Sequence, residues 1–267
     1  LQDMARPVIL ALGGSTTDGV NYGHSWPEEL QKLINEGGQA ATVINGGAGG
    51  YSTNQELIKL LRDGLSFRPD VVISYSGVND RGKYSEMPYP MVHPYQRKII
   101  ESLTATQQSP LLPNTVALLQ GMGGGKAARA IQYTYGVESD GSQAGQFRRN
   151  MELMNAISLS QGARFYGFVQ ANAYYNSRHH LDLKKPKNAE KYVKPLLALY
   201  EEISELPDAL PFLHDATRIF EQHEGVYKDD GIHVTQGGDR IIAEYIYRTI
   251  QKRTEETKPE KSSIQDG

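Results

Sequence analysis

Short apolar runs alternate with longer amphipathic segments along most of the chain. The apolar runs have the length and composition of buried strands and stand at residues 8–10, 41–44, 71–75, 163–169 and 211–213. Apolar side chains recur at helical spacing in the segments between and after them, at residues 27–35, 53–65, 147–162, 189–206 and 237–253. Strands that alternate with helices predict an α/β fold with a parallel central sheet.

Two segments break this alternation. Residues 81–146 include a stretch rich in proline, tyrosine and histidine at 84–95 and one helical pattern at 96–106, and we interpret them as an insertion that forms a lid over the site. Residues 254–267 are charged and poor in apolar side chains, which predicts a frayed tail. We therefore expect one domain over residues 1–253, with an insertion at about 81–146 and a tail at 254–267.

The first three predicted strands all end in turns rich in glycine and small polar residues. Ser15 follows the first strand, Gly50 lies in the turn after the second, and Asn79 lies in the turn after the third. Because ligands of parallel sheets bind at the carboxyl ends of the strands, we expect these residues to share one edge. We interpret the neighbouring Asp80 as a structural anchor rather than a proton carrier.

Ser15 has two interpretations from its local sequence. It follows Gly13 and Gly14, and Asp18 stands three residues later, at the spacing of a helix-capping box. The first interpretation is that Ser15 only caps a helix. The second is that it is a nucleophile, which requires a base and a carboxylate elsewhere in the chain.

Composition narrows the possible classes of function. A net charge of −3 gives no basic excess for binding nucleic acid, and no apolar run is long enough to span a membrane. The absence of cysteine excludes disulfides, thiolate catalysis and cysteine-ligated zinc, and leaves the compartment open. Because the chain begins at Leu1, the lack of a signal peptide carries no conclusion either.

Three further motifs are incomplete. Residues 121–126 resemble a phosphate-binding loop, but Gln120 and Ala127 occupy the positions that need glycine and serine or threonine. A dinucleotide-binding turn after the first strand fails because Thr16 stands where a glycine is required. The pair at 179–180 lies near Asp182, but without a third spaced ligand these histidines indicate a surface loop. We expect neither a cofactor nor a metal.

Asp230 and His233 are separated by two residues, the first of them Gly231, just before the last predicted helix. A turn of this length can bring a carboxylate to the imidazole Nδ1–H and leave Nε2 free to accept a proton. The same pattern also occurs in packing and capping roles. A serine at the other end of a parallel α/β chain favours the catalytic interpretation.

Four blocks in this order resemble the SGNH hydrolases, also called the GDSL esterase/lipase family. They are Gly13-Gly14-Ser15, the Asn-x4-Gly pattern from Asn45 to Gly50, the segment Gly77-Val78-Asn79-Asp80, and the Asp-x-x-His pattern from Asp230 to His233. The resemblance extends over nearly the whole chain. It implies a flavodoxin-like, three-layer α/β/α sandwich around the parallel sheet.

The resemblance also implies a role for each site residue. Ser15 would be the nucleophile, His233 the general base, and Asp230 the group that orients the imidazole. The Ser15 and Gly50 N–H groups and the Asn79 side chain would form the oxyanion hole. The departure is Gly14, where the family usually has an aspartate that braces the loop.

The sequence therefore predicts a metal-independent serine esterase that acts on small acyl esters. The Gly-Gly-Ser-Thr-Thr variant resembles a bacterial branch with long insertions whose members often remove or transfer acyl groups on sugars, which favours acetylated carbohydrate. The compartment is not predicted beyond a lean to the bacterial cell envelope or to secretion. Two alternatives stay open: an acyltransferase that uses the same residues, and a catalytically silent glycan-binding module. The oligomeric state is not predicted.

Overall fold

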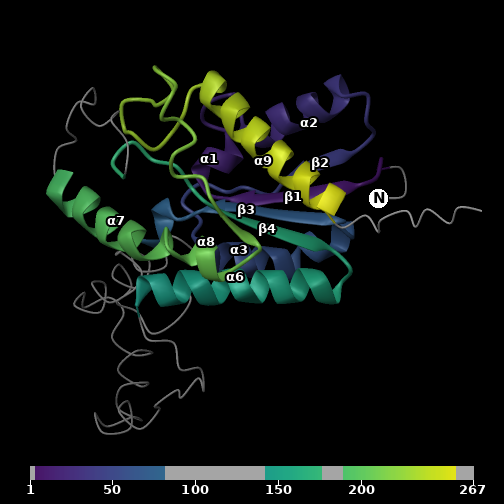
Figure 1. Ribbon diagram of the computed structural model, residues 1–267, viewed down its shortest axis with the longest axis horizontal. Coiled ribbons are helices and arrows are strands. Elements are labelled where there is room, and N and C mark those ends of the chain that lie inside the picture. Colours follow the sequence, from purple (N-terminus) through teal and green to yellow (C-terminus); the bar gives the residue numbers. More distant parts are fainter. Residues whose placement is uncertain (1–3, 82–141, 176–188, 257–267) are drawn as a thin grey trace, which may run out of the picture.

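The computed structural model describes residues 4–81, 142–175 and 189–256. In these residues five strands form one sheet in the order β2-β1-β3-β4-β5, and every neighbouring pair is parallel (Figure 1). The strands are β1 (Val8–Gly13), β2 (Thr42–Asn45), β3 (Val71–Ser76), β4 (Arg164–Val169) and β5 (Leu213–Asp215). The predicted α/β fold with a parallel central sheet is confirmed.

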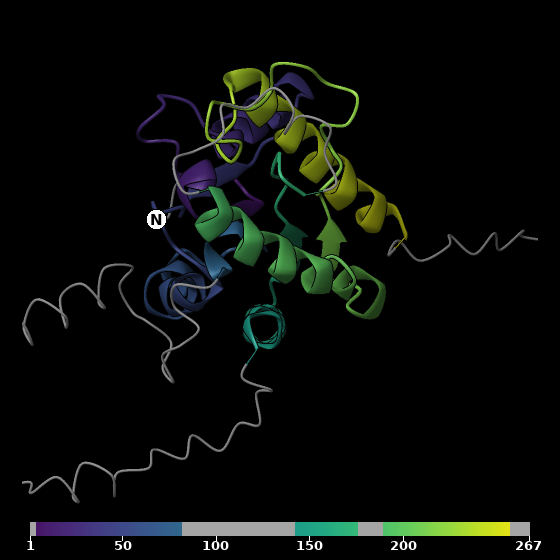
Figure 2. The ribbon, with the colours of Figure 1, turned by 90° about the vertical axis from the view of Figure 1, so that its left-hand side faces the viewer.

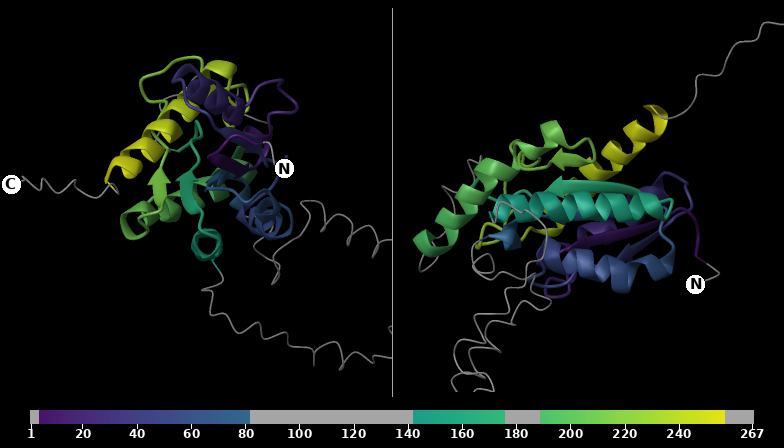
Figure 3. Two further views of the ribbon diagram at one scale, coloured as in Figure 1. Left: turned by 90° about the vertical axis from the view of Figure 1, so that its right-hand side faces the viewer. Right: turned by 90° about the horizontal axis from the view of Figure 1, so that it is seen from below.

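Helices cover both faces of this sheet and give the three layers, which are separate in Figures 2 and 3. One face carries α2 (Trp26–Glu36) and α9 (Gln236–Glu256). The other carries α3 (Thr53–Arg62), α6 (Gln143–Ser160), α7 (Ala189–Ile203) and the short α8 (Leu206–Ala209). One-turn elements complete the described chain: α1 (Ser15–Asp18), η1 (Gly64–Phe67) and η2 (Val78–Asp80).

The strands form because their apolar side chains are buried on both faces of the sheet. All six residues of β1 and all six of β3 are buried. Alternate residues of β1 enter different cores: Ile9 packs toward α2 and α9, whereas Leu10 packs toward α3 and α6. Trp26, at the start of α2, is fully buried in the first of these two cores.

The strand order places the turn that carries Ser15 between the ends of two neighbouring strands. From β1 the chain passes outward to β2 and then crosses to β3 on the other side of β1. The carboxyl ends of β1 and β3 lie side by side, with Gly13 in register with Tyr75. At such a topological switch point the loops diverge to opposite faces and leave a crevice for a ligand. Ser15 begins α1 at this point.

Several predicted boundaries are wrong. The helix expected from Phe147 begins at Gln143, inside the segment assigned to the insertion, because the Ser142 hydroxyl caps it by accepting from Gly145 N at 2.9 Å. The last helix continues to Glu256, into the expected tail. The short last strand begins at Leu213 rather than at residue 211. The segments 96–106, 121–126 and 179–182 lie outside the described residues.

Candidate active site

Tight packing fixes the turn that presents Ser15. An ideal Cβ on Gly13 would stand 2.1 Å from Thr17 Oγ1 and 2.9 Å from the carbonyl oxygen of Tyr75. Only glycine therefore allows β1 to turn into α1 so closely beside β3. Ser15 is the first residue of α1, Gly14 occupies the N-cap position, and no side chain caps this helix. The first of the two interpretations, that Ser15 caps the helix, is therefore wrong.

The loop before α9 brings Asp230 and His233 to Ser15. Gly231, with φ of 68°, makes the turn between them. His233 Nδ1 lies 2.5 Å from Asp230 Oδ2, and His233 Nε2 lies 2.7 Å from Ser15 Oγ. The structure thus brings three side chains together, although Ser15 and His233 are 218 positions apart in the sequence.

The surroundings of Asp230 favour its ionised form. Burial works to raise the pKa of its carboxyl group. The hydrogen bonds that Asp230 accepts from the His233 ring and from the N–H groups of Ile232 and His233, the last two at 2.9 Å, together outweigh burial. The net effect lowers the pKa of Asp230. An ionised carboxylate at Nδ1 selects the tautomer with the proton on that nitrogen. His233 Nε2 is then an acceptor for the Ser15 hydroxyl.

The three groups predicted to hold an oxyanion lie in the turns that follow β1, β2 and β3. Gly50 has φ of 80°, a left-handed conformation that favours glycine. Among the described residues, the backbone N–H groups of Ser15 and Gly50 have no hydrogen-bond acceptor. The Asn79 side-chain amide donates one hydrogen bond to Tyr51 O at 2.9 Å, and its second N–H carries no bond in that part of the chain.

Gly14 and Asn79 are in close contact. An ideal Cβ on Gly14 would lie 2.5 Å from Asn79 Nδ2 and 3.1 Å from the carbonyl oxygen of Tyr51. The glycine therefore leaves the space that the Asn79 amide occupies. A side chain at position 14 would displace that amide from its contact with Tyr51.

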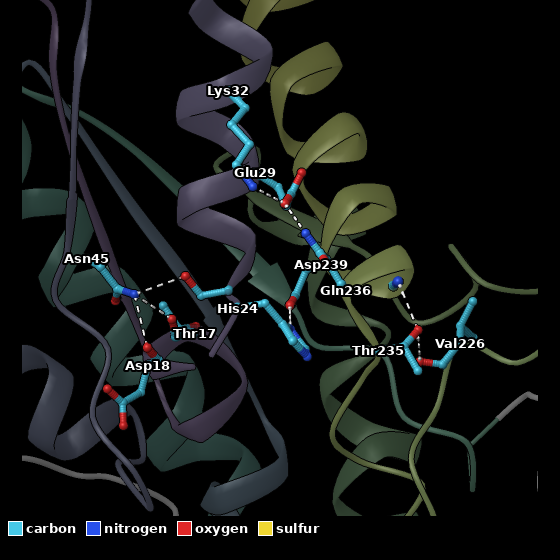
Figure 4. Close-up of polar contacts among 12 residues, drawn as sticks. Thr17, Asp18, His24, Glu29, Lys32, Asn45, Val226, Thr235, Gln236 and Asp239 are labelled. Carbon is cyan, nitrogen blue, oxygen red and sulfur yellow. Dashed lines mark hydrogen bonds and ion pairs between the residues drawn. The ribbon is translucent and has the colours of Figure 1, made fainter. Parts of the chain in front are cut away.

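Asn45 fastens the serine helix to the sheet, a role that the sequence analysis did not assign. Its Nδ2 donates to Thr17 O at 2.8 Å and to Asp18 O at 3.2 Å (Figure 4). Its Oδ1 accepts from Gly47 N at 2.9 Å. Because carbonyls at the end of a helix lack partners within it, this amide satisfies α1 and ties it to the end of β2.

Two buried hydrogen bonds attach α1 to neighbouring elements. Gln170, just after β4, donates to Thr16 Oγ1 at 2.9 Å, and the Trp26 indole donates to Thr17 Oγ1 at 3.0 Å. The first bond joins residues that are 154 positions apart in the sequence, and the second joins residues that are 9 positions apart. The turn that carries Ser15 is thus attached both to the end of β4 and to the start of α2.

Two buried acids support the Asn79 segment from the α3 side. Glu56 accepts hydrogen bonds from Ser74 Oγ, at 2.6 Å, and from Ser76 Oγ. Asp80 Oδ1 accepts from Thr53 N at 3.1 Å and from Thr53 Oγ1 at 2.5 Å. Burial raises the pKa of Glu56 to about 8 and that of Asp80 to about 7. Both carboxyl groups anchor the end of β3 rather than reach Ser15.

The sequence analysis missed a second histidine–carboxylate pair. His24 Nδ1 lies 2.5 Å from Asp239 Oδ2 (Figure 4), and no local spacing links two residues that are 215 positions apart.

Within the described residues, no three histidine or acidic side chains are grouped so that they could hold a metal ion. No helix of the described chain combines the length and apolarity needed to cross a membrane.

Comparisons with known proteins place the chain in a family and relate its fold to solved structures. The model of the GDSL-like lipase/acylhydrolase family matches residues 11–241. A search of curated proteins finds no match. Solved structures with a similar fold include the acetyl xylan esterase AlAXEase, at 16% identity and a TM-score of 0.53, with 91% of this chain and 99% of that chain covered.

Two other similar structures have comparable scores. A lipolytic protein of the G-D-S-L family from Desulfitobacterium hafniense DCB-2 is 14% identical, with a TM-score of 0.50 and coverage of 91% of this chain and 99% of that chain. An acylhydrolase from Bacteroides fragilis NCTC 9343 is 12% identical, with a TM-score of 0.52 and coverage of 92% and 88%. At these identities the likeness concerns the fold.

Proposed function

Because the chain belongs to the GDSL-like lipase/acylhydrolase family and is an ester-bond hydrolase, we propose that it cleaves small acyl esters through Ser15, His233 and Asp230. The observation that carries the proposal is the continuous hydrogen-bonded line from Asp230 through His233 to Ser15, at 2.5 and 2.7 Å. A serine hydroxyl is a weak nucleophile, and a base at hydrogen-bond distance activates it.

The first half of the reaction forms an acyl-enzyme. Ser15 Oγ attacks the ester carbonyl carbon while His233 Nε2 takes the hydroxyl proton. The imidazolium that forms is stabilised by the Asp230 carboxylate at Nδ1. The tetrahedral intermediate collapses, the bond to the leaving alcohol breaks, and His233 returns its proton to that alcohol.

The oxyanion of the intermediate needs donors that are already in place. The free N–H groups of Ser15 and Gly50 and the second N–H of the Asn79 amide meet this need. Losing one such donor costs about 3 kcal/mol in typical enzymes. In the second half, His233 activates a water molecule that attacks the acyl carbon, and Ser15 leaves with its proton restored.

We further propose an acetyl group on carbohydrate as the substrate. Support comes from the Gly-Gly-Ser-Thr-Thr turn, which resembles members that act on acylated sugars, and from the similar fold of an acetyl xylan esterase. Transfer to a sugar hydroxyl would use the same three residues, with the acceptor in place of water.

The test compares wild type with Ser15→Ala on p-nitrophenyl acetate and on a longer acyl analogue. We expect hydrolysis of the acetyl ester and its loss in the variant by at least about a thousandfold. Hydrolysis that survives in Ser15→Ala would refute the mechanism. Product analysis with an acetyl donor and a glycan acceptor separates hydrolysis from transfer. If wild type binds glycan but does not hydrolyse esters, and Ser15→Ala binds glycan equally well, the protein is a binding module instead.

A further inference from the structure

The His24–Asp239 pair lies beside the proposed triad and takes no part in it. His24 stands in the loop between α1 and α2, and Asp239 stands in the first turn of α9. Their side chains are 18% and 2% exposed. In Figure 4 the imidazole lies against the start of α9, with Asp239 directed at it. The pair thus joins the segment that follows Ser15 to the helix that follows His233.

Tyr22 connects this pair to the proposed base. Its ring centroid lies 4.8 Å from that of His233 and 6.2 Å from that of His24. Lys228, from the loop that carries His233, places Nζ 3.7 Å from the same ring centroid. Tyr22, His24 and His233 border one small gap together with Thr16, the residue after Ser15. Tyr22 is therefore the side chain through which a shift of His24 would reach the triad.

The pair is costly to break because Asp239 is buried. Burial raises the pKa of Asp239 to about 6, and the nearby Glu29 of α2 raises it too. The hydrogen bond and charge of His24 lower this pKa, as does the charge of Lys228. Removing His24 would leave a nearly inaccessible carboxylate without its hydrogen-bond donor. We expect α9 to move toward solvent at its first turn in that case.

We propose that His24 and Asp239 form a positioning pair for ester hydrolysis, which holds Tyr22 against His233 and keeps His233 Nε2 at Ser15 Oγ. This inference rests on the proposed function. The pair connects the two segments whose relative position sets the 2.7 Å contact between nucleophile and base. A displacement of about 1 Å in such a contact can lower the rate by about a hundredfold.

A second contact, between α2 and the same first turn of α9, serves as a matched control. Glu29 of α2 accepts from Gln236 of α9 at 3.2 Å and from Lys32 at 2.7 Å (Figure 4). Its side chain is 7% exposed. Glu29 has no hydrogen bond or ring contact with Tyr22 or His233. Glu29→Gln therefore weakens the attachment of α2 to α9 without removing the hydrogen bond between His24 and Asp239.

The experiment measures kcat and KM for p-nitrophenyl acetate, together with the thermal unfolding midpoint. We expect His24→Ala to lower kcat by about ten- to a hundredfold with KM within about twofold of wild type. His24→Asn should restore most of kcat, because its Nδ2 can donate from the place of Nδ1. We expect Glu29→Gln to lower the midpoint and leave kcat unchanged.

The His233 ring N–H resonance, read by proton NMR, gives a measurement that needs no substrate. We expect the low-field signal of the His233–Asp230 hydrogen bond to shift or broaden in His24→Ala and to return in His24→Asn. If His24→Ala keeps kcat and this signal while losing as much stability as Glu29→Gln, the pair is only a structural link and the inference is overturned. If His24→Ala does not fold, Tyr22→Leu decides: a wild-type kcat in that variant overturns the inference. Absence of Ser15-dependent hydrolysis in wild type refutes the proposed function instead.

Discussion

The buried carboxyl groups beneath the Asn79 segment should make the stability of the fold depend on pH. Burial raises the pKa of Glu56 from 4.5 to about 8, against hydrogen bonds from Ser74 and Ser76 that lower it. Asp80, whose charge adds to the rise, has its own pKa raised by burial from 3.8 to about 7. Its Oδ2 is a buried oxygen without a hydrogen-bond partner among the described residues.

The direction follows from proton binding. Because the folded pKa of Glu56 lies above the unfolded value, the folded protein holds this proton more tightly. The stabilising effect is complete below the unfolded pKa, and the free energy of unfolding then falls as the pH rises through the folded pKa. For a shift from 4.5 to about 8, the loss attributable to Glu56 between pH 5 and pH 9 is at most about 4 kcal/mol.

Glu56→Gln isolates this effect. The glutamine keeps one acceptor oxygen for a serine hydroxyl and can donate from Nε2 to the other, as the protonated acid donates from its O–H. It resembles the protonated acid in shape and cannot ionise. We expect its free energy of unfolding to exceed that of wild type increasingly as the pH rises, with a gap that grows by up to about 4 kcal/mol between pH 5 and pH 9. Urea unfolding followed by circular dichroism at several pH values measures the difference. The matched control is Glu28→Gln, since Glu28 is an exposed glutamate at the start of α2.

The reasoning is refuted if the gap between Glu56→Gln and wild type changes by less than about 1 kcal/mol over this range. It is also refuted if Glu28→Gln shows the same change, because the effect would then not depend on burial.

Two substitutions test the site itself. Asp230→Asn keeps an acceptor for the N–H groups of Ile232 and His233 but loses the charge at Nδ1; we expect kcat/KM for p-nitrophenyl acetate to fall about 10³- to 10⁴-fold, and a fall below about tenfold would contradict the proposed role. Gly14→Ala places a Cβ 2.5 Å from Asn79 Nδ2. We expect kcat to fall about 10²- to 10³-fold with a small change in thermal midpoint. An unchanged kcat would show that catalysis does not depend on the present position of the Asn79 amide.

The apolar pattern predicted the fold because burial determines where strands and helices form. The runs before Ser15 and Asn79 are buried on both faces, so they became β1 and β3. Boundaries failed where a polar contact decided them. Residues 143–146 carry little apolar pattern, yet Ser142 caps α6 there and Ala144 is buried. A local capping bond of this kind extends a helix past the point where its apolar periodicity begins.

Long-range polar contacts were beyond the sequence because nothing local selects their partners. Asp230 and His233 could be paired from their spacing, since one turn joins them. His24 and Asp239 could not, because their contact exists only once α2 and α9 pack on the same face of the sheet. The same holds for Gln170, which meets Thr16 only after β4 has taken its place beside β3.

Gly14 shows how a departure from a family pattern is interpreted differently in three dimensions. From the sequence, the missing aspartate predicts a loop without its usual brace. In the structure, the Asn79 amide fills the space beside Gly14 and reaches the Tyr51 carbonyl oxygen. The turn that carries Ser15 is thus packed against the end of β3 by the same amide that is proposed to hold the oxyanion. A side chain at position 14 and the present position of Asn79 exclude each other, so the two sequence blocks are physically coupled.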